Sequence, residues 1–300
     1  MTPRFSLSSL ALTAVAGAAL LSYALPAQSF IAYAAQGVEV AQIVPLTGPL
    51  ANVGKEVNTI TKATLEDFNK GSKTTQIALK TYGDGNVADN STQLATQAVA
   101  SAQALISYAA ELDKAAANFP ALKITRSALN PASPDYGKSV AELIPGSPKV
   151  LLLLANSAHS TQFLDAWKAK SSLPFVLNLA GQANGQFASG MKGYDGAAAF
   201  ATVTPSPRET KIDAQREYQR IAKSAGMSPS YLGFESYLNA RALIEAVTQT
   251  KSPTKTELVR WLDNAPRLDL GGYSVGYGGD KLGSNFTDLA LLRSDGTYRH

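Results

Sequence analysis

Short apolar runs alternate with helical patterns along the chain from residue 38 to residue 203. The runs at 38–43 and 76–82 are rich in β-forming residues, and the stretch between them, 52–70, predicts a helix. After Pro120 the same alternation predicts strands at 122–125, 149–154, 174–179 and 197–203, with helices at 136–143 and 160–170. A strand, a turn and a helix in repetition predict an α/β fold with parallel sheets. The unbroken apolar run at 149–154 (KVLLLL) predicts a strand that is buried on both faces.

One predicted helix is unusually long. It begins near Asp89, and no glycine or proline interrupts the sequence before Pro120. Its apolar stripe, at steps of three, four and seven, consists of Leu94, Ala98, Leu105, Ala109, Leu112, Ala116 and Phe119. Such a helix would have about 30 residues, whereas helices of globular domains average about 11–12.

The last third of the chain is predicted to be helical first and then β. The patterns at 211–224 and 230–248 predict two long helices, and Thr254 with Glu257 forms a capping box for a third. From Leu270 onward the sequence is rich in glycine and alternates between apolar and polar residues. This tail predicts a β-hairpin with a long turn around 278–280.

The composition of the N-terminus differs from that of the rest. Arg4 is the only charged side chain among the first 34 residues, and an apolar stretch follows from Leu10 to Leu25. Ala32-Tyr33-Ala34 then fits the small-x-small cleavage pattern, so we predict a signal peptide over 1–34 that is cleaved near Ala34. A membrane anchor is the alternative, but the apolar run is shorter than the ~20 residues that a span needs.

The remaining composition excludes several kinds of chemistry. The chain has no cysteine, which excludes disulfides, thiolate catalysis and cysteine metal ligands. Its formal net charge is +4, but the basic residues are scattered, so no nucleic-acid partner is predicted. His159 and His300 are the only histidines, and we predict neither a metal site nor a cofactor. His159 follows a predicted strand, where a place in a ligand cleft and a plain surface position both stay open.

One motif of hydrolases occurs in the tail. Gly272-Tyr273-Ser274-Val275-Gly276 matches the GxSxG pattern, and Asp288 or Asp295 and then His300 follow in hydrolase order. The nucleophile of such enzymes needs a strand before it and a helix after it, whereas turn sequence follows Gly276 here. We therefore favour a plain strand of the terminal hairpin and expect no enzyme.

The segment 45–56 (PLTGPLANVGKE) resembles the PLTGPLAxxGxE loop of the periplasmic leucine/isoleucine/valine-binding (type I) family of ABC-transporter substrate-binding proteins. The segment 80–84 (KTYGD) resembles the second strand of that family with its Asp pair, although Gly83 replaces the first Asp. The segments 231–247, 268–272 and 288–298 are similar to the family in the same order. The resemblance implies a two-lobed clamshell of Rossmann-like parallel sheets, a ligand between the lobes and docking on membrane permease subunits.

The sequence also departs from that family. The predicted long helix joins two helices that the family separates by several βα units, so we expect an internal deletion at 106–111 that leaves lobe one incomplete. The expected lobes are 35–107 with 206–265 for lobe one, and 108–205 with 266–300 for lobe two. Lobe one would then keep only two strands, with an open sheet edge. The helices 211–224 and 230–248 would expose part of their apolar faces.

The resemblance also places a ligand cleft. Thr47, Gly48, Val53, Asn156 and Gln182 lie at or beyond the ends of predicted parallel strands, so we predict that they are closest to the ligand. The positions that hold an amino acid in the family differ here, so amino acid specificity does not carry over. The predicted function is delivery of a small solute, such as an amino acid or a related organic acid or amide, to an ABC importer in the periplasm. The alternatives are a degenerate, non-binding remnant or interaction protein and, as the weakest, a secreted serine hydrolase.

Overall fold

The computed structural model describes most of the chain beyond residue 35. The described residues are 36–83, 113–114, 116–130, 133–183, 185–191, 198–250, 253–278, 283–293, 295 and 298–299. The predicted signal peptide and most of the predicted long helix, including the expected junction at 106–111, lie outside them. In the part that is described, no helix combines the length and the apolar character that crossing a membrane requires.

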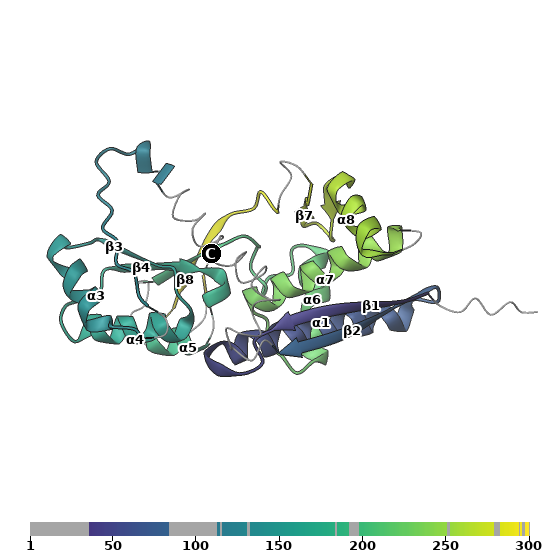
Figure 1. Cartoon of the computed structure of the whole chain (residues 1–300), viewed down its shortest axis with the longest axis horizontal. Helices are drawn as coiled ribbons and strands as arrows, with labels where there is room; N and C mark the ends of the chain where they lie inside the picture. The colour runs from purple at the N-terminus through teal and green to yellow at the C-terminus, as the bar shows by residue number, and fades with distance from the viewer. Residues whose placement is uncertain are drawn as a thin grey trace, which may run out of the picture. The chain divides into compact units, whose positions relative to one another are not determined.

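The first described unit is a strand–helix–strand arrangement. Strands β1 (Gln36–Val44) and β2 (Thr75–Gly83) pair in parallel. Helix α1 (Ala51–Gly71) connects them in sequence and runs alongside the pair (Figure 1). A short 3-10 helix, η1 (Gly48–Leu50), leads into α1. β1, α1 and β2 lie where the sequence predicts them. Within the described residues the sheet has only these two strands, so each has one edge without a partner.

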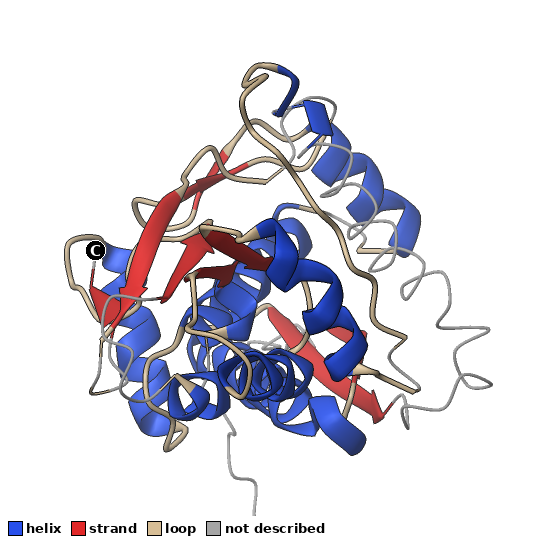
Figure 2. Ribbon diagram, turned by 90° about the vertical axis from the view of Figure 1, so that its left-hand side faces the viewer, coloured by secondary structure: helices blue, strands red, loops and turns tan. Residues whose placement is uncertain are grey.

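A five-stranded sheet forms the second arrangement. Its order is β3 (Val150–Leu153), β4 (Phe175–Leu179), β5 (Ala198–Thr202), β8 (Asp288–Leu292) and β9 (Tyr298–Arg299). The first three strands are parallel, and the last two are antiparallel to their neighbours. Helices α3 (Tyr136–Leu143) and η2 (Ile144–Gly146) precede β3. The helices that connect β3, β4 and β5 are α4 (Ser157–Lys168), η3 (Ala180–Gln182) and α5 (Gly185–Gly190). Figure 2 shows the strands in red and the helices in blue. Parallel strands connected by helices confirm the predicted α/β class.

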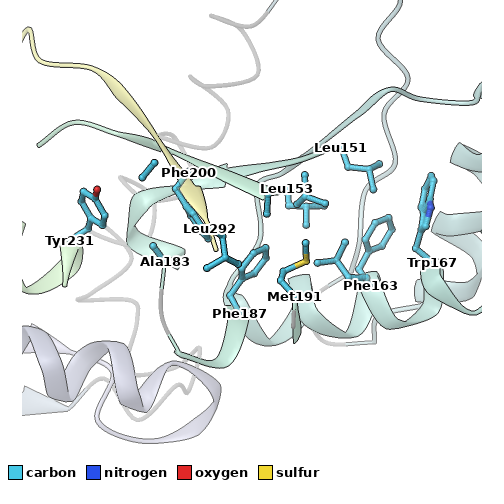
Figure 3. Packing of buried hydrophobic residues seen from close by; sticks show 14 of the residues in the cluster. Leu151, Leu153, Phe163, Trp167, Ala183, Phe187, Met191, Phe200, Tyr231 and Leu292 are labelled. Carbon is cyan, nitrogen blue, oxygen red and sulfur yellow. The ribbon is translucent and has the colours of Figure 1, made fainter. Parts of the chain in front are cut away.

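The core of this sheet lies between the strands and helices α4 and α5. Leu153 and Leu292 come from the sheet, Phe163 from α4 and Phe187 from α5, and all belong to one cluster of buried side chains (Figure 3). Phe187 and Phe200 meet edge to face with their ring centroids 5.1 Å apart. This packing explains why the apolar positions of α4 recur at helical spacing.

Two predictions for this region are wrong. β3 is not buried on both faces, because Leu151 and Leu153 are buried whereas Val150 is 51% and Leu152 38% exposed. β3 is an edge strand of the sheet, and a continuous apolar run does not show whether its second face has a covering layer. The strand predicted at 122–125 is irregular and exposed, because its backbone finds no neighbouring strand among the described residues.

The helices near the C-terminal end are α6 (Asp213–Ser224), α7 (Tyr231–Gln249) and α8 (Lys255–Asn264). α7 packs against α1, α6 and α8. Ile244 and Val247 of α7 join the core of β1 and β2, while Phe234 and Tyr237 join a second core with α6. The expectation that α6 and α7 expose part of their apolar faces is therefore wrong, because α7 finds apolar partners on both sides.

The glycine-rich tail differs from one long hairpin. β6 (Leu268–Asp269) pairs with β7 (Ser274–Val275), and an antiparallel bridge joins Gly276 to Gly283 around the predicted turn. β8 instead joins the five-stranded sheet beside β5, and β9 pairs with β8. The β-structure predicted from the alternating pattern is confirmed, but the strands divide between two sheets.

Candidate functional site

The motif at 45–56 has a physical reason in the loop before α1. Gly48 has a φ of 69°, a left-handed conformation that favours glycine. Gly54 is buried where α1 passes the backbone of Pro45, and a Cβ atom on Gly54 would lie 1.9 Å from the Pro45 carbonyl oxygen. Both glycines therefore bring the loop against the first turn of α1. Glu56 follows two residues later on the same helix.

The five predicted site residues fall into two groups. Thr47, Gly48 and Val53 lie on the loop and first turn of α1, with Thr47 and Gly48 exposed and Val53 partly buried. Asn156 and Gln182 follow β3 and β4, the neighbouring parallel strands whose ends lie together. Nothing in the described contacts brings the first group against the second.

Asn156 and Gln182 already have intramolecular partners. The Asn156 side chain caps α4 by accepting a hydrogen bond of 2.9 Å from the His159 amide. The Ser157 hydroxyl donates to the Gln182 side-chain oxygen at 3.1 Å. His159 is therefore next to Asn156, and its Nδ1 lies 2.7 Å from the Tyr136 hydroxyl.

A cavity of about 290 Å³ is lined by Gly181 and Ala183, the residues on either side of Gln182. Its walls come from α1, the segment after β4, the crossing 206–208, the loop 227–230, the start of α7, and β9. The polar lining residues include Glu56, Ser206, Arg208, Ser230 and Tyr298. None of the five predicted residues lines it, although Gly181 is next to Gln182 in sequence and Glu56 lies three residues after Val53.

Glu56 is the acidic residue of the cavity. Burial raises the pKa of its carboxyl, and hydrogen bonds from the Ser230 hydroxyl and the Gly233 amide lower it in part. Ser230 is the N-cap of α7, so the carboxylate lies near the positive end of that helix dipole. Glu56 therefore joins α1 to the start of α7 and also presents an acid to the cavity.

Tyr298 and Tyr231 form an aromatic wall. Their ring centroids are 6.0 Å apart at 76°, and Tyr298 also meets Phe200 edge to face at 5.4 Å. Tyr231 and Ala183, which both line the cavity, lie toward one end of the core cluster (Figure 3). Burial raises the pKa of Tyr298 to about 12, and the nearby positive charge of Arg208 lowers it in part. The phenol is therefore neutral and keeps its O–H donor at neutral pH.

The hydrolase pattern has a different structural context from the one it needs. Ser274 is exposed on β7, and its hydroxyl accepts a hydrogen bond of 3.3 Å from Arg267 Nε. An antiparallel bridge at Gly276 follows instead of a helix. The nucleophile elbow that GxSxG would require is therefore absent from 272–276, where Ser274 and Val275 form the plain strand that the sequence favours. His300 lies outside the described residues.

Sequence reasoning missed the cavity for two reasons. Glu56 was part of the quoted motif, but its role depends on contact with Ser230, 174 residues later in the chain. Arg208 lies in the crossing marked by Pro205 and Pro207, where no pattern distinguishes it from other scattered basic residues. Only the proline-marked crossing was a usable signal.

Comparison with known proteins gives the context of this site. No family model matches the sequence, and the comparison with curated proteins gives no match. Among solved structures, an extracellular ligand-binding receptor from Verminephrobacter eiseniae is similar with a TM-score of 0.71 at 17% identity, covering 89% of this chain and 100% of that one. A possible leucine/isoleucine/valine-binding protein from Rhodopirellula baltica has a TM-score of 0.72 at 15% identity, over 89% and 97% of the two chains.

A branched-chain amino acid ABC transporter protein from Thermus thermophilus, with bound valine, has a TM-score of 0.63 at 12% identity, over 88% and 95%. These identities are low, so the likeness concerns the fold and not the ligand. The resemblance found at 45–56 agrees with it, because the loop and α1 occupy their predicted places. The chain therefore has the α/β fold of the leucine/isoleucine/valine-binding (type I) substrate-binding proteins of ABC transporters.

Proposed function

We propose that this protein binds a small solute outside the cytoplasm and delivers it to the permease subunits of an ABC importer. The cavity of about 290 Å³ is the observation that carries this proposal. Its volume is near the lower end of the ~300–1,000 Å³ of ligand pockets, which favours a small solute. The structural neighbours, several of which are described as substrate-binding proteins, support the same role. In this proposal the protein has no enzymatic activity.

The proposed architecture is a clamshell of two lobes. Lobe one comprises 35–107 with 206–265 and is incomplete, and lobe two comprises 108–205 with 266–300. Among the described residues the sheet of β1 and β2 has two strands, which supports an incomplete lobe one, because parallel sheets ordinarily have more strands. The proposed signal peptide, 1–34, is removed near Ala34 and leaves the mature chain in the periplasm.

The five predicted residues border the cleft in this proposal. Thr47, Gly48 and Val53 approach the solute from lobe one, and Asn156 and Gln182 approach it from lobe two. The cavity supplies the innermost contacts, and these residues surround its approach. Because Thr47 is exposed, a tryptophan at this position obstructs the cleft without disturbing the core.

The first experiment is a thermal-shift screen of amino acids, organic acids and amides. A solute at 100 times its Kd stabilises a protein by about 2.7 kcal/mol, which corresponds to a rise in Tm of roughly 5–10 °C. We expect one class of solute to give such a rise and Thr47→Trp to reduce it. A folded protein whose Tm no solute changes would favour the second candidate, a non-binding remnant or interaction protein.

That second candidate has one specific observation in its favour. Val150 and Leu152 of β3, with Leu289 and Leu291 of β8, are exposed apolar residues of the same five-stranded sheet. Exposed apolar patches mark interaction sites in many proteins. The built cavity argues for solute binding as the first candidate.

A further inference from the structure

We propose that the segment 84–112 of this chain packs on the outer face of the five-stranded sheet, with the apolar stripe of its predicted helix against the strands. The outer face is the one that points away from α4 and α5, whose side chains form the core on the other face. This inference goes beyond the proposed function and does not depend on it. It follows from the composition of the outer faces of the two sheets and from the place where the chain continues after residue 112.

The outer face of the five-stranded sheet is apolar across β4, β5 and β8. The register places its residues in two cross-strand rows, Leu177–Ala199–Leu291 and Leu179–Ala201–Leu289. Leu289 is 53% exposed and Leu291 is 37% exposed. The small side chains of β5 lie between the leucines of β4 and β8, so the middle of this face is lower than its sides. Because parallel strands ordinarily have both faces covered, such a face indicates a missing layer.

The outer face of β1 and β2 is different, because it carries charges. Glu39 and Lys80 are exposed there, and Lys80 Nζ lies 3.9 Å from the Glu39 carboxylate. The same Nζ lies 5.5 Å from the ring centroid of Tyr82, which is also exposed. Covering these charges with an apolar layer would be unfavourable. An apolar stripe therefore finds its match on the five-stranded sheet and not on β1 and β2.

The segment 84–112 has the length and the pattern for this position. The predicted stripe includes Leu94, Leu105 and Leu112. As a helix, 94–112 would be about 27 Å long, which exceeds the ~17 Å of a five-residue strand. A helix is about 10–12 Å across and strands lie ~4.8 Å apart, so one helix covers two or three strands. It would cover β4, β5 and β8 and would leave the edge strand β3 outside.

The chain after this segment is held beside the same sheet. Asp113 forms an ion pair with Arg126. The Ser127 hydroxyl donates a hydrogen bond of 2.8 Å to the Glu142 carboxylate of α3. Leu129 packs against the core of the five-stranded sheet. The segment therefore ends next to the sheet whose outer face is open among the described residues.

This packing has a consequence for the proposed lobes. The segment begins directly after β2, so it would tie the sheet of lobe one to the sheet of lobe two, in addition to the crossing 206–208. It would also cover part of the apolar surface on which the interaction-protein candidate depends.

The test uses the absence of cysteine from the chain, because a single introduced thiol then reports on its own position. Leu289→Cys places the thiol on the outer face of the five-stranded sheet, and Tyr82→Cys, at a 45% exposed position of β2, is the control. In the mature protein we expect the thiol of Leu289→Cys to react with a water-soluble maleimide about tenfold more slowly, because it must wait for local opening. Adding Leu105→Lys should abolish this protection. Adding Gln103→Lys, which places the same side chain on the opposite face of the predicted helix, should preserve it.

A photo-crosslinker identifies the covering segment without any change in that segment. The photo-reactive residue p-benzoylphenylalanine, in place of Leu289, should crosslink to a peptide from 84–112 of the same chain. Equal reactivity of the two thiols would show an open face and would overturn the inference. A crosslink to a second copy of the chain, with protection lost on dilution, would overturn it in favour of a dimer. No crosslink to 84–112, or equal effects of Leu105→Lys and Gln103→Lys, would also overturn it.

Discussion

At the residue scale, Gly54 shows how the motif acts on structure. Glycine inside a helix ordinarily costs about 1 kcal/mol relative to alanine. At Gly54, however, alanine should destabilise the protein relative to glycine. An added Cβ would lie 1.9 Å from the Pro45 carbonyl oxygen, so the backbone would have to move. We expect Gly54→Ala to lower the free energy of unfolding by about 1–3 kcal/mol, an effect of overpacking, in urea denaturation.

Gly71 is the matched control for this prediction. It ends the same helix, and an added Cβ there would meet no atom within 4 Å. Gly71→Ala should therefore be neutral or stabilising. If both variants had the same stability as the wild type, the close approach of Pro45 to α1 would be wrong.

Glu235 is a second residue with a measurable consequence. Burial on α7 raises the pKa of its carboxyl to about 7 from 4.5, so the folded state holds a proton that the unfolded state releases. The unfolding free energy should therefore fall as pH rises from about 4.5 to about 7, by roughly 3 kcal/mol at most. Glu235→Gln should remove this fall and stabilise the protein at pH 8 but hardly at pH 4.

Urea denaturation at the two pH values measures the difference between Glu235→Gln and the wild type. Carboxylates whose pKa is lowered, such as Asp67 beside Arg220, lose their contribution in acid in both proteins, so they cancel in this difference. Glu66→Gln, at an exposed position of α1, serves as the control. Equal stabilisation by Glu235→Gln at both pH values would contradict the account.

At the scale of elements, periodicity predicted most of the described strands and helices. α3 begins and ends where the sequence placed it, and β1, α1 and β2 differ from prediction by one or two residues at each end. Hydrophobic spacing is a local property, and so are caps such as Ser230 and Thr254. The strand predicted at 122–125 failed because a strand also needs a partner, which the local sequence does not encode.

The faces of β3 give an element-scale prediction from adjacent residues of one apolar run. Leu153 is buried in the core, whereas Leu152 is 38% exposed on the opposite face. Leu153→Ala should cost about 2–5 kcal/mol, as in other cores, and Leu152→Ala less than about 1 kcal/mol. Chemical denaturation compares the two variants. Equal losses would show that another part of the chain covers the second face of the sheet.

At the scale of the whole molecule, the sequence predicted the fold class but not the cavity. The resemblance at 45–56 can be recognised from the sequence because that loop is one continuous segment. It led to the correct fold. The cavity combines side chains from α1, the crossing 206–208, α7 and β9, which no sequence spacing brings together. Its polar groups could be found only after the strands and helices were placed.

The two sheets should also differ in stability. In the part of the chain that the structure describes, β4 has a paired neighbour on both sides, whereas β1 and β2 each have one. In native-state hydrogen exchange, the amides of β4 should therefore be better protected than those of β1 and β2. Equal protection in both sheets would indicate one cooperative unit and would argue against an incomplete lobe one.

The most direct test of solute binding at this cavity is calorimetric titration of three proteins. Ser228 is exposed and lines the cavity, so Ser228→Trp should fill it without disturbing the core. Ser224→Trp introduces the same side chain at an exposed position of α6 that does not line the cavity. The account predicts that a solute binds the wild type and Ser224→Trp with equal affinity, and Ser228→Trp at least tenfold more weakly. Equal affinity for all three proteins would contradict it.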